Sequence, residues 1–186
     1  MSVDLRGLGL LITRPAAQAQ RLAHKILTAQ GEPILFPTLE IADTDKPEAA
    51  GAILASLGSF DWAIFISANA VEKTFSLMGQ AAWPEKLAVA AIGAATAEAL
   101  RNHGLKKILS PVENFDSEAL LALAEFQTIK NLRIVIFRGE GGRETLKQTL
   151  AARGAEVIYC ETYRRIKPVA PINYLLQCLA QKKIHA

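Results

Sequence analysis

The sequence predicts an α/β fold with parallel β-sheet, and two observations support this prediction. First, short apolar runs of strand length alternate with segments of helical periodicity along most of the 186 residues. Second, some of these runs, such as residues 87–92, are apolar throughout, which is typical of strands that are covered on both faces. Three runs stop at a small or polar residue just before a helical pattern begins. Open parallel sheets bind ligands beyond the carboxyl ends of their strands, so we expect a site at these three turns.

The first elements form a βαβ unit. Residues 8–13 read as a strand, and Pro15 suits the first turn of the helix that follows. Gly31 is a good helix stop, and residues 33–37 form a second short strand bounded by prolines. The apolar stripe of this helix has spacings of three and four residues and consists of Ala19, Leu22, Ala23, Ile26 and Leu27.

Residues 39–42 alternate in polarity and read as an exposed or connecting strand, and a helix follows over 47–57. The strands expected after this helix are 61–67, 87–92, 106–109, 132–138 and 155–160. The helices expected between them are 69–79, 94–103, 116–127 and 142–153, with Asp116 or Ser117 as the cap of the third. This regular alternation predicts a parallel sheet with helices on both faces.

The chain reads as two domains, of which the first is discontinuous. Residues 40–163 are enough for one complete domain, whereas two strands and one helix cannot bury an adequate core. One more amphipathic helix follows from Pro171 to about Lys183, and residues 184–186 resemble the start of a strand. We therefore expect a first, incomplete domain of residues 1–37 plus 167–186 that is truncated at the C-terminus, and a second domain of residues 38–166. The chain is then a fragment of a longer protein, or it pairs with another one.

Composition excludes several classes of protein. The formal charge of +3 is mild, and no concentrated basic patch points to nucleic acid. No apolar run approaches the ~20 residues of a membrane span, and the N-terminus has no signal-peptide pattern. Cys160 and Cys178 match neither a disulfide framework nor a metal site, which is typical of reduced thiols in a cytoplasmic protein. The histidines have no partners at metal-ligand spacing.

Six segments in order resemble the uroporphyrinogen-III synthase family over nearly the whole chain. They are Leu11-Ile12-Thr13-Arg14-Pro15, Phe36-Pro37-Thr38-Leu39-Glu40-Ile41, Phe65-Ile66-Ser67-Ala68-Asn69-Ala70-Val71, Ala91-Ile92-Gly93-Ala94-Ala95-Thr96-Ala97, Phe115-Asp116-Ser117-Glu118-Ala119-Leu120 and Glu161-Thr162-Tyr163-Arg164-Arg165. The resemblance implies two flavodoxin-like domains joined by two connecting strands, here residues 39–42 and 162–166. It also implies a chain that starts in one domain, crosses to the other and returns.

The resemblance further implies a lyase of tetrapyrrole and haem biosynthesis that needs no cofactor and no metal. Its substrate is the linear tetrapyrrole hydroxymethylbilane, which the enzyme cyclises with inversion of ring D and loss of water. Ring closure without inversion occurs unaided, so the protein must bias the geometry of the chain and assist departure of the hydroxyl group. We expect the complete protein to act as a monomer in the cytoplasm, without membrane or nucleic-acid partners.

Candidate site residues follow from the turns and from the resemblance. Tyr163 matches the family tyrosine that is thought to assist loss of the hydroxyl group. A phenol suits this role because it is protonated at neutral pH and can donate a hydrogen bond or a proton. Carboxylates of the substrate suit backbone N–H groups, hydroxyls and arginines, with Arg143 as one further charge. The expected substrate-binding residues are Thr13, Arg14, Ser67, Asn69, Gly93, Thr96, Arg138 and Gly139.

Two other readings remain open at this point. One is a nucleotide-binding enzyme, because residues 138–143 resemble a phosphate-cradling loop, although they match neither GxGxxG nor GxxxxGK[ST]. The other is a two-lobed small-molecule-binding protein without enzymatic activity. A phosphate-receiver domain is disfavoured, because it needs acidic residues at the carboxyl ends of its strands.

Overall fold

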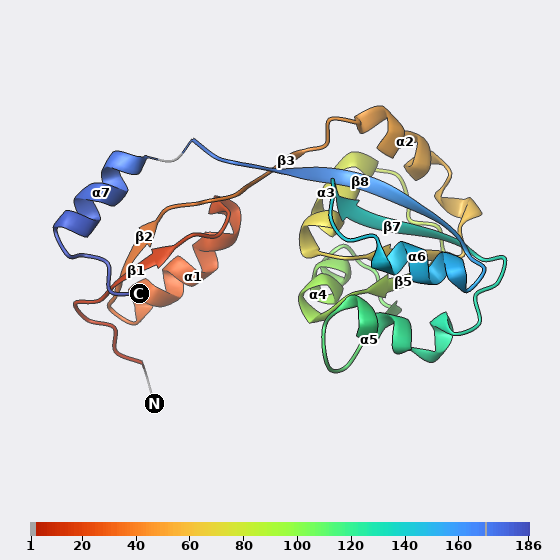
Figure 1. Ribbon diagram of the computed structural model, residues 1–186, viewed down its shortest axis with the longest axis horizontal. Helices are drawn as coiled ribbons and strands as arrows, with labels where there is room; N and C mark the ends of the chain where they lie inside the picture. Colours follow the sequence, from red (N-terminus) through yellow and green to blue (C-terminus); the bar gives the residue numbers. More distant parts are fainter. Residues whose placement is uncertain (1–2, 170) are drawn as a thin grey trace. The chain divides into compact units, whose positions relative to one another are not determined.

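The computed structural model describes residues 3–169 and 171–186, which form two compact units (Figure 1). Unit 1 combines the residues up to Ala42 with those from Arg165 onward, and unit 2 runs from Asp43 to Arg164. The sequence placed the corresponding boundaries at 37/38 and 166/167. Both units combine helices with parallel strands, so the predicted α/β class is confirmed.

Unit 1 opens with the expected βαβ unit, which consists of β1 (Gly9–Ile12), α1 (Ala16–Thr28) and β2 (Glu32–Leu35). The two strands are parallel. Helix α1 buries Ala19, Ala23 and Ile26 in a small core with Ile12. Leu22 and Leu27, expected on the same stripe, are 36% and 58% exposed. The stripe of α1 is therefore wider than the surface that this small core covers.

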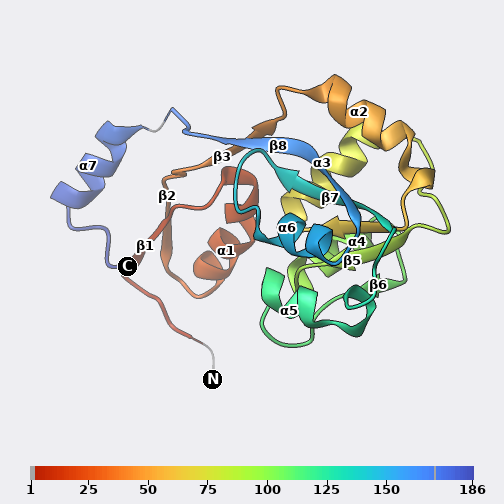
Figure 2. The same cartoon turned by 45° about the vertical axis from the view of Figure 1, so that its right-hand side comes forward.

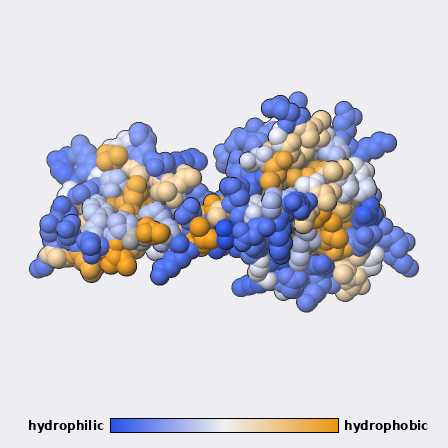
Figure 3. All heavy atoms as spheres, turned by 90° about the horizontal axis from the view of Figure 1, so that it is seen from above, coloured by the Kyte–Doolittle hydropathy of each residue, from blue (hydrophilic) through white to orange (hydrophobic). Residues whose placement is uncertain are grey.

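The end of the chain lies along the free edge of β1. The backbone N–H of His185 donates to the carbonyl of Gly9 at 2.8 Å, and the N–H of Leu11 donates to the carbonyl of Ala186 at 2.7 Å. Residues 184–186 were expected to begin a strand; these two hydrogen bonds are strand-like, but the residues do not form a regular strand. Helix α7 (Ile172–Ala180) precedes this segment and buries Cys178, while Ile172, Leu176 and Leu179 remain exposed. Apolar surface of unit 1 is visible in the left-hand part of Figure 3.

A six-stranded sheet with the strand order β3-β8-β7-β4-β5-β6 forms the frame of unit 2. The pairings from β8 to β6 are all parallel. The strands are β3 (Glu40–Asp43), β4 (Trp62–Phe65), β5 (Ala88–Ala91), β6 (Ile108–Leu109), β7 (Arg133–Gly139) and β8 (Glu156–Ile166). The helices are α2 (Pro47–Ala55), α3 (Ala68–Met78), α4 (Ala94–Asn102), α5 (Ser117–Ala122) and α6 (Thr145–Ala152). Short 3₁₀ turns lie at Leu57–Ser59 and Ala124–Phe126.

Helices cover both faces of this sheet, as predicted. Helix α3 packs beside α2 and α4, and α5 packs beside α6 on the near side in Figure 2. Ile64, Ile134 and Ile136 join the core cluster that includes residues of α5 and α6. The alternate residues Phe65 and Phe137 stack with their ring centroids 4.5 Å apart. Successive side chains of a strand point to opposite faces, and both faces of β7 are covered, so residues 134–137 of this strand are all apolar and buried.

Three elements differ from the expected ones for local reasons. The helix expected over 116–127 is interrupted because Leu123 is extended, with φ −61° and ψ 143°. Asp116 caps its first part, since its carboxylate accepts the N–H of Ala119 at 2.8 Å. The helix expected from 142 begins at Thr145, because Gly141 and Gly142 have φ of 70° and 106°. The segments expected at 155–160 and 162–166 are one continuous strand, β8.

Candidate functional site

The carboxyl ends of four strands of unit 2 meet at one edge of the sheet. Phe65 of β4 pairs with Phe137 of β7 on one side and with Ala91 of β5 on the other. Two positions further, the chain reaches Gly139, Ser67 and Gly93, and Tyr163 of β8 lies opposite Gly139. We call this set the carboxyl-edge row: Tyr163, Gly139, Ser67 and Gly93. The register therefore brings together four of the residues that were predicted from separate motifs.

A bulge in β8 brings Tyr163 into this row. Arg138 pairs with Glu161, but the next residue of β7, Gly139, pairs with Tyr163, so Thr162 has no partner in the register. A bulge re-aims side chains by inserting one extra residue. Tyr163 is fully buried, and its hydroxyl lies 3.1 Å from the Oγ of Ser67. The two hydroxyls form a hydrogen-bonded pair between β8 and the start of α3.

Ser67 also begins helix α3. Its backbone is extended, and its Oγ accepts the N–H of Ala70 at 3.1 Å. Serine is a preferred residue at this position because its oxygen satisfies an N–H that has no partner inside the helix. The same side chain therefore caps a helix and contacts Tyr163. Asn69 lies in the first turn of α3 and is half-buried.

Gly139 provides the space in which the ring of Tyr163 lies. A Cβ added to Gly139 would come within 2.6 Å of the Cε2 and Cζ atoms of that ring. The structure therefore uses this residue as a close backbone support for Tyr163.

Gly93 is constrained by the space around it and not by its backbone conformation. Its backbone is extended, with φ −172° and ψ 175°, so any residue could adopt this conformation. Space is the constraint, because a Cβ at this position would lie 2.7 Å from the Cβ of Phe115. Phe115 is 56% exposed. Thr96 lies in the first turn of α4, as expected, but its side chain is buried.

Arg138 is the largest difference between the expected site and the structure. We expected a substrate-binding charge, but the residue is only 2% exposed. Its Nε donates to the carbonyl of Gly139 at 3.2 Å, and its Nη1 donates to the Glu144 carboxylate at 3.0 Å. Further hydrogen bonds reach the carbonyls of Gly141 and Arg143. The guanidinium thus organises the loop after β7, and its donors are occupied by that loop.

The guanidinium also lies 4.2 Å from the centroid of the Tyr159 ring, in cation–π geometry. Arg143, by contrast, is exposed on the same loop. Of the two arginines, Arg143 is the one whose side chain can reach a ligand without rearrangement.

Glu140 was missed as a structural residue of this region. Its carboxylate accepts hydrogen bonds from the Thr44 hydroxyl at 2.9 Å and from the N–H of Asp45 at 3.1 Å. These two bonds, followed by the nearby charges of Lys46 and Arg164, lower the pKa of Glu140 below its ordinary value. The carboxylate therefore fixes the segment that precedes α2. Nothing in the sequence indicates these contacts, because Thr44 and Asp45 are 96 and 95 residues away from Glu140 along the chain.

The two remaining predicted residues, Thr13 and Arg14, belong to unit 1. They follow β1, and both are exposed. The carbonyl of Thr13 accepts the N–H and the hydroxyl of Thr38 at 3.1 and 3.3 Å. Each unit thus carries candidate residues at the carboxyl end of a parallel strand.

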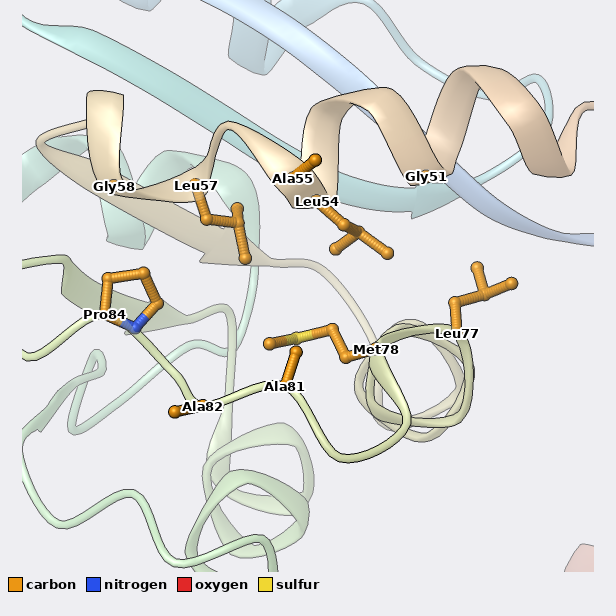
Figure 4. A pocket seen from close by; sticks show the side chains of 10 residues that line it. All are labelled: Gly51, Leu54, Ala55, Leu57, Gly58, Leu77, Met78, Ala81, Ala82 and Pro84. Atoms are coloured by element: carbon orange, nitrogen blue, oxygen red, sulfur yellow. The ribbon is translucent and has the colours of Figure 1, made fainter.

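The largest side chains around one further hollow of unit 2 come from residues outside the carboxyl-edge row. Within residues 3–169 and 171–186, no cluster of three or more His, Cys, Asp or Glu side chains could hold a metal ion. A hollow of about 390 Å³ lies between α2, α3 and the loop that precedes β5 (Figure 4). Leu54, Leu57, Leu77 and Met78 are its large side chains, and most of its other lining residues are glycine or alanine. It lies toward the amino ends of β4 and β5, away from the carboxyl-edge row.

A family comparison identifies the chain. Residues 20–186 match the family model described as uroporphyrinogen-III synthase HemD. The chain belongs to the uroporphyrinogen-III synthase family.

Curated members of this family align with most of the chain. It is 38% identical to the uroporphyrinogen-III synthase of Escherichia coli K12 over 160 residues, which are 85% of this chain and 65% of that protein. It is 35% identical to the synthase of Proteus mirabilis, over 86% of this chain and 81% of that protein. The chain thus spans 65% of the length of the first of these relatives.

Solved structures of uroporphyrinogen-III synthases share the fold. A mutant enzyme from the extreme thermophile Thermus thermophilus aligns with a TM-score of 0.63 at 18% identity, over 95% of this chain and 70% of that one. The Helicobacter pylori enzyme aligns with a TM-score of 0.51 at 14% identity, over 91% of this chain and 67% of that one. No helix among the described residues is long and apolar enough to cross a membrane.

Proposed function

We propose that this chain provides uroporphyrinogen-III synthase activity. In this reaction hydroxymethylbilane, a linear tetrapyrrole, is cyclised with inversion of ring D and loss of water, within tetrapyrrole and haem biosynthesis. Family membership at 38% identity to the Escherichia coli synthase supports the assignment. The single observation in the structure that carries it is the pair of hydroxyls, Ser67 and Tyr163, at the carboxyl edge of the sheet.

The chemistry of this pair suits departure of a hydroxyl group. An alcohol leaves as water only when a donor supplies a hydrogen bond or a proton to its oxygen, and protonated hydroxyls provide such a donor at neutral pH. The cation that forms on the substrate is stabilised by nearby oxygen atoms. The reaction changes no oxidation state, so we propose that it proceeds without a redox cofactor.

The carboxylates of the substrate require a second set of contacts. Gly93 caps α4 without a side-chain oxygen, so the first N–H groups of this helix are open to a ligand. Ala94 and Ala95, which carry two of these N–H groups, are exposed. The exposed Arg143 and, in unit 1, Thr13 and Arg14 are further proposed contacts. The role of Thr96 is limited to its position in this turn, because its side chain is buried.

We further propose that the complete protein is a monomer that acts in the cytoplasm and has no nucleic-acid or membrane partner. The mild formal charge of +3 supports the absence of a polyanionic partner. Cys160 and Cys178 are both free and buried, which agrees with a reducing compartment.

The experiment that tests the proposed activity measures the isomers of the product. The purified protein with its first domain complete is supplied with hydroxymethylbilane, the products are oxidised to porphyrins, and types I and III are separated by chromatography. We expect an excess of type III, whereas the heat-denatured protein as control should give type I alone from unaided closure. Type I alone from the native protein would contradict the proposal.

A further inference from the structure

The two hydroxyls of the carboxyl-edge row differ in access. Tyr163 has no exposed surface, because its ring lies against Gly139 and is enclosed between β7 and the start of α3. Ser67 is only partly buried and lies at the surface of the sheet edge. A ligand that approaches this edge therefore meets Ser67 before it meets the buried phenol.

In one arrangement of its hydrogen bonds, Ser67 can donate its hydroxyl proton to such a ligand. A serine hydroxyl offers two lone pairs and one proton. The N–H of Ala70 can only donate, so it occupies one lone pair of Oγ. When the phenol of Tyr163 donates to the other lone pair, across 3.1 Å, the serine proton remains available to a third group. A hydroxyl that accepts hydrogen bonds also becomes a better donor, because hydrogen bonds in a chain polarise one another.

From this geometry we infer that Ser67, and not Tyr163, is the hydroxyl that contacts the substrate, and that Tyr163 is a buried positioning residue that acts through Ser67. The inference rests on the proposed synthase function. In it, Ser67 donates a hydrogen bond to the departing hydroxyl of the substrate. Tyr163 holds the serine oxygen in place and strengthens it as a donor. The two residues therefore work in series, and the effect of the tyrosine depends on the serine.

A kinetic double-mutant cycle tests this order. The variants are Ser67→Gly, Tyr163→Phe and the combination of both, assayed for kcat and KM of type III formation. Glycine suits this position because it is tolerated at the start of a helix, so the loss is mainly that of the hydroxyl. We expect kcat to fall about 100-fold in Ser67→Gly and about tenfold in Tyr163→Phe, with KM little changed. In the Ser67→Gly background, Tyr163→Phe should cause no further loss, and Ser67→Thr should retain most of kcat.

Asp116→Ala is the matched control for the loss of a helix cap. Asp116 caps α5 through the N–H of Ala119, just as Ser67 caps α3, so this variant should lower the melting temperature without changing kcat. The inference is overturned if Tyr163→Phe lowers kcat by the same factor with and without Ser67. It is also overturned if Ser67→Gly leaves kcat unchanged.

A second readout does not depend on catalysis. Because the two side chains share a hydrogen bond, the decreases in melting temperature of the two single variants should sum to more than the decrease in the double variant. Additive shifts would show that the pair does not interact in solution. A wild-type chain that forms type I alone would refute the proposed function, whereas an active wild type with an independent tyrosine would refute only the inference.

Discussion

The replacement of Arg138 by methionine tests how the loop after β7 is held in place. Methionine keeps most of the apolar volume of the side chain but removes every donor of the guanidinium. In the native structure these donors serve the Glu144 carboxylate and the carbonyls of Gly139, Gly141 and Arg143. Their loss should release the loop and lower the stability of unit 2.

The expected loss of stability in Arg138→Met depends on which hydrogen-bond partners of Arg138 remain buried. Removing one member of a fully buried ion pair costs about 3–5 kcal/mol. Glu144 is 52% exposed and the Gly141 and Arg143 carbonyls lie on an exposed loop, so water can replace their lost partner. Gly139 is buried, and its unsatisfied carbonyl costs about 1–3 kcal/mol. With the lost contact to the Tyr159 ring, we expect about 3 kcal/mol, or a decrease of about 10 °C in melting temperature.

Thermal unfolding followed by circular dichroism measures this decrease. Arg143→Met is the control, because its exposed side chain lies on the same loop; we expect a change of at most about 0.5 kcal/mol. A decrease in melting temperature for Arg138→Met that is no larger than for Arg143→Met would refute the reasoning. So would an unchanged melting temperature combined with a raised KM, because this pattern would identify Arg138 as a substrate contact.

Three other predictions concern the same region of unit 2. Gly139→Ala should lower the stability of unit 2 by about 1–3 kcal/mol and reduce type III formation, because the new Cβ collides with the Tyr163 ring. Gly51→Ala is the control and should not destabilise the protein, because a Cβ there meets nothing within 4 Å. Equal melting temperatures for the two variants would contradict this prediction. Glu140→Gln should weaken the dependence of the melting temperature on pH below about pH 5. Because the pKa of Glu140 is lowered in the folded state, its stabilisation is present above the unfolded value and is lost as pH falls through the folded value; parallel pH curves for wild type and variant would disprove it. Burial, and secondarily the charge of Glu161, raises the pKa of Cys160 to about 12. This thiol should therefore resist iodoacetamide at about pH 8 until urea unfolds the chain. Rapid labelling of the native protein at Cys160, mapped by mass spectrometry, would contradict this prediction.

Local patterns in the sequence were sufficient for the order and type of the main elements. Uninterrupted apolar runs predicted the buried strands β4, β5 and β7, since a strand covered on both faces has no polar face. The spacing of three and four residues predicted α1, and Asp116 was one of two expected caps for α5. These features depend on neighbours in sequence, so they can be read without the fold.

Features that depend on contacts between distant residues were not predictable in this way. The bulge that brings Tyr163 opposite Gly139 is a property of the pairing of β7 with β8. The burial of Arg138 depends on the path of the following loop, and an arginine at a strand end reads equally well as a ligand-binding charge. The space constraint at Gly93 also depends on a distant residue, because the side chain that excludes a Cβ belongs to Phe115.

The rate of type III formation by the combined variant Ser67→Gly/Tyr163→Phe tests the central claim most directly. If the hydroxyl pair at the carboxyl edge carries the reaction, this variant should remain folded, with a cooperative melting transition, while its rate of type III formation falls about 100-fold and the type I isomer of unaided closure increases. A folded variant that forms type III at the wild-type rate would contradict the claim and exclude this edge of the sheet as the catalytic site.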